Sequence, residues 1–335
     1  MKTWRSGQQY PIPSNLRQKI TLSLGFAALV YLALTLYADA PKLALTFLNW
    51  NWRWLLLTIP AVLANYLVRA VRWHYYLHVI GADYVPPRAS LLIFLSGFSL
   101  TMVPGKLGEL VKSILLKSHY DVPITRSAPI IAVERLTDVL GMLFLAALGL
   151  SHYPLGVPMF ALVLAGTSAL ILLIQVRALA DYLLTRVERL PVVGRFAHVI
   201  RNLYESTYVM LQWRPLLIAL ALSVVAWFGE CLALLFILLG FGLAPTFELL
   251  LQATFIYAAA SLFGAALMLP GGLGATEGSM ALLLQQVVSV AHADSVAATL
   301  IVRLCTLWLA VLLGVIAVLA LGTSRPSRLS QTWKV

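Results

Sequence analysis

A series of long apolar runs constrains this chain more than any other feature. Residues 215–240 contain one charged side chain, Glu230, and residues 296–321 contain only Arg303. A helix of about 20 apolar residues crosses the roughly 30 Å hydrocarbon core of a bilayer. Charged residues make up 11% of the sequence, whereas soluble domains carry about 25%. These values predict an all-α, polytopic membrane protein with almost no sequence left for a soluble catalytic domain.

We expect one membrane domain over 1–335, with six full transmembrane helices and two helical hairpins, countable as eight. The expected spans are 20–38, 54–76, 127–150, 157–176, 215–240 and 296–321, and the hairpins are 88–118 and 248–292. The first hairpin's descending arm, 90–103, would be only about 21 Å long, which predicts a re-entrant element. It stays open whether the second hairpin crosses the whole membrane.

Two polar segments separate these elements. Residues 39–53 are predicted as a short loop ending in Trp50, Trp52 and Trp54, which is typical of an interfacial aromatic belt. In residues 177–214, arginines alternate with Leu, Val and Ile. This pattern predicts an amphipathic helix lying on the cytoplasmic membrane surface.

Each hairpin contains a copy of one short motif. The residues Pro104, Gly105, Leu107, Gly108 and Ser113 match Pro270, Gly271, Leu273, Gly274 and Ser279. Proline removes a backbone donor and glycine adopts angles that other residues avoid, so Pro-Gly-x-x-Gly predicts a broken helix. Such a break at membrane depth is tolerated where it is buried in protein or lines a cavity.

The similarity extends beyond the motif. Val133-Glu-Arg-Leu-Thr137 lies over Ile301-Val-Arg-Leu-Cys305, so the repeated unit is span, hairpin, span, at about 54–150 and 215–321. The intervening fourth span gives the two copies opposite orientations. An inverted repeat with two interrupted helices is typical of secondary transporters, whose binding site lies between the repeats.

The basic residues predict the orientation. With the N-terminus and C-terminus in the cytoplasm, 20 of the 24 Lys and Arg residues lie on the cytoplasmic side, as the positive-inside rule requires. This places the protein in the cytoplasmic membrane as a multi-pass protein. The net charge of +11 is then explained by anionic lipid at that face, and no nucleic-acid partner is expected. A homo-oligomer stays open.

The helix that restarts after each Pro-Gly break should present unpaired N–H groups, which form an anion site suited to phosphate. Charged side chains at membrane depth add to it, because they usually face a cavity and pair with each other. The expected substrate-binding residues are Gly105, Lys106, Gly108, Glu109, Glu134, Arg135, Asp138, Glu230, Gly271, Gly272, Gly274, Thr276, Glu277 and Arg303.

Plainer interpretations stand beside this one. Glu109 and Glu277 would serve equally well as helix caps, and Arg135 and Arg303 would pair structurally with a carboxylate such as Glu230. Arg69 and Arg72 are expected to extend to the membrane interface. His74 and His78 have the i, i+4 spacing of a zinc helix but no third ligand is evident, so neither a metal nor a cofactor is expected.

Four motifs together resemble the lysylphosphatidylglycerol synthase transmembrane-region family. They are Arg69-x-x-Arg72-Trp73, Val103-Pro-Gly-Lys-Leu-Gly-Glu109, Glu134-Arg-x-x-Asp138 and Leu269-Pro-Gly-Gly-Leu-Gly-Ala-Thr-Glu277-Gly. The family includes the flippase part of the bacterial multiple peptide resistance factor, and the resemblance covers roughly 20–320. It implies movement of phospholipids, notably aminoacylated phosphatidylglycerol, between leaflets. The aminoacyl-transferase domain of the two-part relatives is absent, so we expect no lipid synthesis.

The expected function is that of a lipid flippase or related lipid transporter and not of an enzyme. Two rivals stay open. A membrane glycosyltransferase or lipid-modifying enzyme using a polyprenyl-phosphate donor would be expected to show an Asp-x-Asp metal site or catalytic acids in a large outer loop. A membrane scaffold would not need charged residues at matching depths in both repeats. The lipid, its direction of movement and the energy source are not specified by the sequence.

Overall fold

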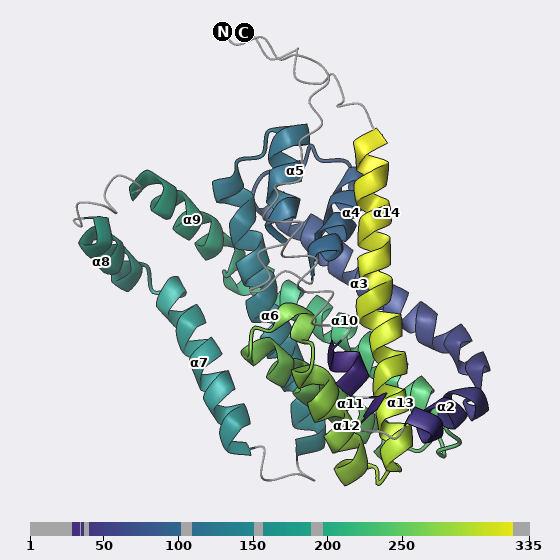
Figure 1. Cartoon of the computed structure of the whole chain (residues 1–335). Helices are drawn as coiled ribbons and strands as arrows, with labels where there is room; N and C mark the ends of the chain where they lie inside the picture. Colours follow the sequence, from purple (N-terminus) through teal and green to yellow (C-terminus); the bar gives the residue numbers. More distant parts are fainter. Residues whose placement is uncertain are drawn as a thin grey trace.

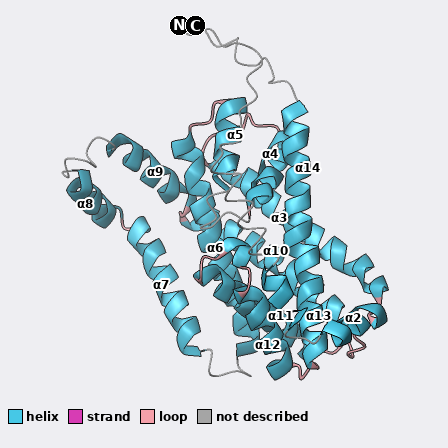
Figure 2. Cartoon of the chain, in the orientation of Figure 1, coloured by secondary structure: helices cyan, strands magenta, loops and turns pink. Residues whose placement is uncertain are grey.

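The structure is a computed structural model that describes residues 29–33, 35–36, 40–101, 109–150, 157–188 and 197–323. Every regular element in these residues is helical (Figure 2), which confirms the all-α class. The principal helices are α2 Ala40–Asn49, α3 Leu55–Val79, α4 Pro87–Ser96, α5 Val111–Tyr120, α6 Ile124–Leu150, α7 Val157–Gln175, α8 Arg177–Glu188, α9 Ala197–Met210, α10 Trp213–Gly240, α11 Phe247–Ala266, α12 Ala275–Val287, α13 His292–Arg303 and α14 Leu309–Thr323.

Four helical stretches among the described residues are long and apolar enough to cross a membrane. They are Trp52–Val79, Trp213–Gly240, Phe247–Ala266 and His292–Leu321. These confirm a multi-pass membrane protein. The third expected span, α6, has 27 residues and is long enough to cross. It is less apolar than these four, because it carries Glu134, Arg135 and Asp138.

Several helices of the first half of the sequence pack against helices of the second half. Among the partners are α3 with α10, α6 with α10, α6 with α11, and α4 with α14 (Figure 1). The α3–α10 contact is close because of a glycine: a Cβ added to Gly229 would lie 2.9 Å from the carbonyl oxygen of Ala61. Beside it, Asn65 Nδ2 donates a hydrogen bond of 2.8 Å to the carbonyl oxygen of Ala226. Small residues commonly permit such approach between membrane helices.

The hairpins are built from unequal arms. In the first hairpin, α4 continues into a 3₁₀ turn, Gly97–Leu100, and this arm is one of the shorter apolar helices, as predicted. The break that we expected at Pro-Gly-x-x-Gly, with Gly105, Lys106 and Gly108, falls in 102–108, outside the described residues. In the second hairpin, α11 has 20 residues and ends before a 3₁₀ turn, Pro270–Gly272. Gly271, Gly272 and Gly274 all have positive φ, so this Pro-Gly motif breaks the helix as expected.

The segment 39–53 is not the loop that we expected. Ala40–Asn49 forms α2, because Leu43 packs into an apolar cluster with Ala281 and Val296. Trp50 is buried against other helices: it is 3% exposed, and its Nε1 donates to the carbonyl oxygen of Ile237 at 3.1 Å. Its partners are remote in sequence, so the local pattern did not reveal them.

The long polar stretch forms two helices, α8 and α9, where we expected one. Together with α7 they lie along one side of the molecule (Figure 1), and α9 packs against α6. Arg177 Nη2 and Glu205 Oε2 form an exposed ion pair of 2.9 Å between the two helices. A location on the membrane surface stays a prediction.

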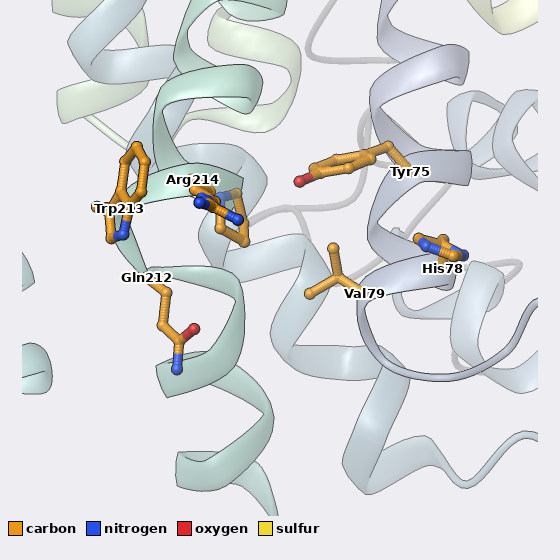
Figure 3. A pocket seen from close by; sticks show the side chains of 7 residues that line it. Tyr75, His78, Val79, Gln212, Trp213 and Arg214 are labelled. Carbon is orange, nitrogen blue, oxygen red and sulfur yellow. The ribbon is translucent and has the colours of Figure 1, made fainter.

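A surface cavity of about 410 Å³ opens between the C-terminal end of α3 and the N-terminal end of α10 (Figure 3). Its lining residues are Tyr75, His78, Val79, Gln212, Trp213, Arg214 and Pro215. None of the buried charged residues described next belongs to it.

Candidate functional site: a buried ionic cluster

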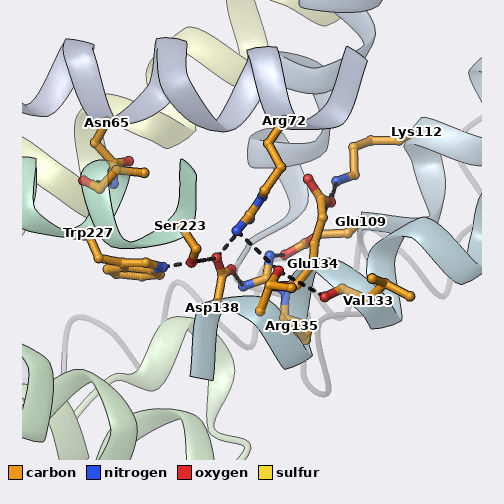
Figure 4. A network of polar contacts seen from close by, with 12 residues as sticks. Asn65, Arg72, Glu109, Lys112, Val133, Glu134, Arg135, Asp138, Ser223 and Trp227 are labelled. Carbon is orange, nitrogen blue, oxygen red and sulfur yellow. Dashed lines mark hydrogen bonds and ion pairs between the residues drawn. The ribbon is translucent and has the colours of Figure 1, made fainter. Parts of the chain in front are cut away.

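Six charged side chains meet inside the helical body and form what we call the buried ionic cluster (Figure 4). Its members are Arg72 of α3, Glu109 just before α5, Lys112 of α5, and Glu134, Arg135 and Asp138 of α6. Arg72 is 0% exposed and Asp138 is 1% exposed. The three cations balance the three carboxylates, as is required for charges removed from water.

Asp138 joins three helices. Its carboxylate pairs with Arg72 Nη2 of α3 at 2.7 Å and with Arg135 Nη1 of its own helix at 3.3 Å. From α10, Trp227 Nε1 donates to Oδ1 at 2.9 Å and Ser223 Oγ donates at 3.2 Å (Figure 4). One carboxylate therefore couples α3 and α6 of the first half to α10 of the second.

Lys112 occupies the other end of the cluster. Its Nζ lies 2.8 Å from Glu134 Oε2 and 3.6 Å from Glu109 Oε2. The ammonium also lies 4.4 Å from the ring centroid of Trp73, a cation–π contact. Gly97 makes room for the side chain, because a Cβ there would be 2.9 Å from Lys112 Cγ.

Arg135 is paired within its own half of the chain. Its Nη2 donates to Glu109 Oε1 at 2.5 Å, and its side chain stays 25% exposed. The plainer interpretation, that Arg135 pairs with a carboxylate, is confirmed, but the carboxylates are Glu109 and Asp138 and not Glu230. Glu109 lies 26 residues earlier in the chain, so only the folded hairpin brings the two together.

A second ion pair lies at the second Pro-Gly break. Arg303 Nε donates to Glu277 Oε1 at 2.6 Å, and Arg303 Nη2 donates to the carbonyl oxygen of Gly271 at 2.6 Å. The other carboxylate oxygen of Glu277 accepts the N–H of Gly274 at 2.7 Å. Glu277 therefore acts as a cap at the start of α12, and the partner of Arg303 is Glu277 and not Glu230.

Thr276 is also buried at this break. Its Oγ1 fills the space beside two glycines, because a Cβ on Gly264 or on Gly272 would lie 1.9 Å or 2.7 Å from it. Directly after Arg303, residues Leu304–Trp308 form a π-helical turn, and Tyr66 donates its hydroxyl hydrogen to the carbonyl oxygen of Thr306. Turns of this kind are frequent at functional sites.

Two charged side chains near the buried ionic cluster, Arg69 and Glu230, have no ion-pair partner among the described residues. The guanidinium of Arg69 lies between two rings, 5.4 Å from the centroid of Phe98 and 5.5 Å from that of Trp227, and its buried Nε has no hydrogen bond there. Glu230 is 5% exposed and accepts a hydrogen bond from the Tyr257 hydroxyl. They come from α3 and α10, the two helices that pack most directly across the halves.

The structure therefore sorts the expected site residues into groups. Glu109, Glu134, Arg135 and Asp138 meet in the buried ionic cluster, whereas Gly271, Gly272, Gly274, Thr276, Glu277 and Arg303 gather at the second break and Glu230 lies apart. The structure thus brings eleven of the fourteen expected residues into these three places. The other three, Gly105, Lys106 and Gly108, are outside the described residues.

Sequence reasoning missed Arg69, Arg72 and Lys112. The first two were expected at the membrane interface, which is wrong for Arg72, because Asp138 draws it fully into the protein. The i, i+3 spacing of Glu109 and Lys112 was a usable signal for an ion pair. In the described part of the chain, no group of three or more potential metal ligands is found.

Comparison with known proteins identifies the family. A family model described as the lysylphosphatidylglycerol synthase TM region matches residues 20–314, which include both hairpins and the buried ionic cluster. The chain is also 24% identical over 294 residues to the UPF0104 membrane protein PH1989 of Pyrococcus horikoshii, covering 80% of this chain and 87% of that protein. No solved structure matches. The chain belongs to the lysylphosphatidylglycerol synthase transmembrane-region family.

Proposed function

We propose that this protein moves phosphate-bearing phospholipids between the two leaflets of the cytoplasmic membrane. One observation carries the proposal: Arg69 is a cation without an ion-pair partner among the described residues, held between two aromatic rings beside an otherwise balanced cluster. An arginine fork binds two oxygens of a phosphate. A headgroup phosphate would supply the anion that Arg69 lacks.

The neighbouring charges would make room for the headgroup by exchanging partners. Arg72, Arg135 and Lys112 each lie near more than one carboxylate or ring. An incoming phosphate competes with Asp138 for arginine donors, while Trp227 and Ser223 continue to donate to Asp138. Aminoacylated phosphatidylglycerol or another lipid with an amine would place that amine near a carboxylate such as Glu230.

An inverted repeat is part of the same proposal, with copies at about 54–150 and 215–321. In the two copies, α4 corresponds to α11 and α6 corresponds to α14. The packing of α6 with α11 and of α14 with α4 supports the repeat, since a two-fold axis between the copies would exchange one contact for the other. The two Glu–Arg pairs support it as well, because both have a separation of 26 residues. Movement of one repeat against the other would expose the site to each leaflet in turn.

The topology completes the proposal. Six full spans with two hairpins place both termini in the cytoplasm, as the distribution of basic residues predicts. In this arrangement Arg177 and the rest of α8 and α9 face anionic lipid. The flippase part of the multiple peptide resistance factor, which this chain resembles, also moves phospholipids between leaflets.

Reconstituted liposomes test the proposal. Purified protein is incorporated with fluorescent phosphatidylglycerol, and dithionite is added outside to quench the outer leaflet. We expect wild type to expose the inner-leaflet fluorophore and Arg69→Gln to lose most of this activity. The matched control is Arg177→Gln, which removes an exposed arginine of α8 that is not a member of the cluster and should remain active.

Two results would contradict lipid movement. Protection equal to that of empty liposomes, with anionic, zwitterionic and aminoacylated headgroups and with an imposed ion gradient of either sign, would leave the enzyme and scaffold interpretations. An equal loss of lipid movement in Arg69→Gln and Arg177→Gln would show that Arg69 has no specific role in it.

A further inference from the structure

We propose that the cavity between α3 and α10 is a second lipid site, which binds the headgroup of an anionic phospholipid at the membrane surface. It contains no member of the buried ionic cluster. The inference goes beyond the proposed function, because binding here requires no movement of lipid between leaflets.

The cavity has the size and the lining of a headgroup site. Its volume of about 410 Å³ lies within the roughly 300–1,000 Å³ range of ligand pockets. Across the opening, the guanidinium of Arg214 and the hydroxyl of Tyr75 point toward one another (Figure 3). Neither side chain has a hydrogen bond or an ion pair with the part of the chain that the structure describes. Two donors thus converge on one space without an acceptor between them.

The charge of the lining favours an anion. The lining residues include Arg214 and His78 and no carboxylate. The nearest acidic group to His78, Asp83, already accepts from the Nδ1 atom of that histidine. Arg214 stacks on Trp213, with its guanidinium carbon 4.9 Å from the ring centroid, so the guanidinium is held at the cavity wall. A phosphodiester is the anion that a membrane offers at this depth.

The helix faces below the cavity suit acyl chains. On α3, Val71 and Leu67 follow Tyr75 at steps of four residues toward the membrane interior, and they are 51% and 58% exposed. On α10, Leu217 follows Trp213 at the same step and is 56% exposed. Residues four apart lie on one face of a helix. The cavity therefore continues into two exposed apolar stripes, which distinguishes a phospholipid from a soluble phosphate ester.

The position of the cavity agrees with this ligand. Trp213 is 64% exposed at the beginning of a membrane-spanning helix, and Tyr75 lies near the end of another. Tryptophan and tyrosine are enriched at the level of the headgroups. Basic pockets between transmembrane helices bind anionic headgroups at the cytoplasmic side, which is the side that the basic residues assign to this end of α3.

Fluorescence quenching by a brominated lipid tests the site. The full-length protein is reconstituted in phosphatidylcholine bilayers with increasing fractions of phosphatidylglycerol that carries bromine on its acyl chains. Bromine quenches a tryptophan against which the lipid binds. The difference between wild type and Trp213→Phe isolates the signal of Trp213 from those of the other tryptophans.

We expect Trp213 to be quenched at low fractions of phosphatidylglycerol. Arg214→Gln should need about ten-fold more of this lipid, because a charge-assisted hydrogen bond contributes an amount equivalent to about one factor of ten or more. Arg53→Gln is the matched control: Arg53 is an exposed arginine between Trp52 and Trp54 at the opposite end of α3, and its loss should leave the quenching of Trp213 unchanged.

Three results would overturn the inference. They are an unchanged titration in Arg214→Gln, equal shifts in Arg214→Gln and Arg53→Gln, and displacement of the lipid by excess inorganic phosphate. The last would assign the cavity to a soluble anion. Arg214 is exposed, so a thermal unfolding curve equal to that of wild type will establish that the variant is folded.

Discussion

Arg303 and Glu277 are 26 residues apart in the chain, and their side chains are 2.6 Å apart in the structure. Arg135 and Glu109 have the same separation of 26 residues, and theirs are 2.5 Å apart. In both pairs the carboxylate stands at the beginning of a hairpin's second arm and the arginine in the long helix that follows. Each pair thus ties the second arm of a hairpin to the helix that follows it.

The two pairs should respond differently to the loss of the arginine. Arg303→Ala leaves Glu277 buried without a cation, which should cost about 3–5 kcal/mol of stability. Arg135→Ala should cost less, because Glu109 keeps a second cation, Lys112, whose Nζ lies 3.6 Å from Glu109 Oε2, whereas Glu277 has no other ion-pair partner among the described residues. Denaturant unfolding of the purified variants in mixed micelles measures the loss of stability in each. A larger loss of stability for Arg135→Ala would show that Lys112 does not compensate the charge of Glu109.

Asp138→Asn should be among the most damaging single changes in the cluster. The amide oxygen can still accept from Trp227 and Ser223, but Arg72 and Arg135 lose a shared anion inside the protein. We expect a loss of several kcal/mol, of the order of a broken buried pair at about 3–5 kcal/mol. The control Ser223→Ala removes one neutral donor to the same carboxylate and should cost about 1 kcal/mol. Similar losses in both variants would show that charge is not what holds α3, α6 and α10 together.

Gly229→Ala should separate the two helices that connect the halves. The added methyl group would lie 2.9 Å from a backbone oxygen, that of Ala61, so α3 or α10 must shift. Overpacking of this kind costs about 1–3 kcal/mol. Gly166→Ala is the control, because nothing lies within 4 Å of its Cβ and alanine favours a helix over glycine. Thermal unfolding should show Gly229→Ala below wild type and Gly166→Ala equal to or above it.

The membrane class and the broken helix at Pro270–Gly272 could be predicted from the sequence, because both follow from local composition. Apolar runs in 215–240 and 296–321 determine where chain can cross a bilayer, and proline with glycine determines where a helix stops. The candidate acidic and basic residues on α6 could also be identified, since charges at membrane depth are rare.

The ion-pair partners could not be predicted, because they depend on how distant helices pack. From the sequence, Arg72 was expected at the membrane interface. In the structure it pairs with Asp138 of α6, which lies 66 residues later in the chain. Lys112 looked like one of many basic residues on the cytoplasmic side, and only the space left by Gly97 lets it reach Glu134. The helix α2 was missed for the same reason, since Leu43 gains its apolar partners from Ala281 and Val296.

Glu230 provides the sharpest test of how a headgroup would be recognised. It is buried on α10 and accepts a hydrogen bond from Tyr257, and the cations that act on it electrostatically are Arg69 and Arg303. If Arg69 binds the phosphate, Glu230 is the carboxylate without a cation of its own that remains for an amine. Glu230→Gln keeps an acceptor for the Tyr257 hydroxyl and removes only the charge.

We therefore expect Glu230→Gln to fold normally and to change lipid preference. In the liposome assay, phosphatidylglycerol should move at a rate close to that of wild type, whereas an amine-bearing lipid such as phosphatidylethanolamine should move several-fold more slowly. Tyr257→Phe is the control, because it removes the hydrogen bond and leaves the carboxylate in place, so the preference should persist. If Glu230→Gln slows both lipids equally, Glu230 supports the helix packing and does not select the headgroup.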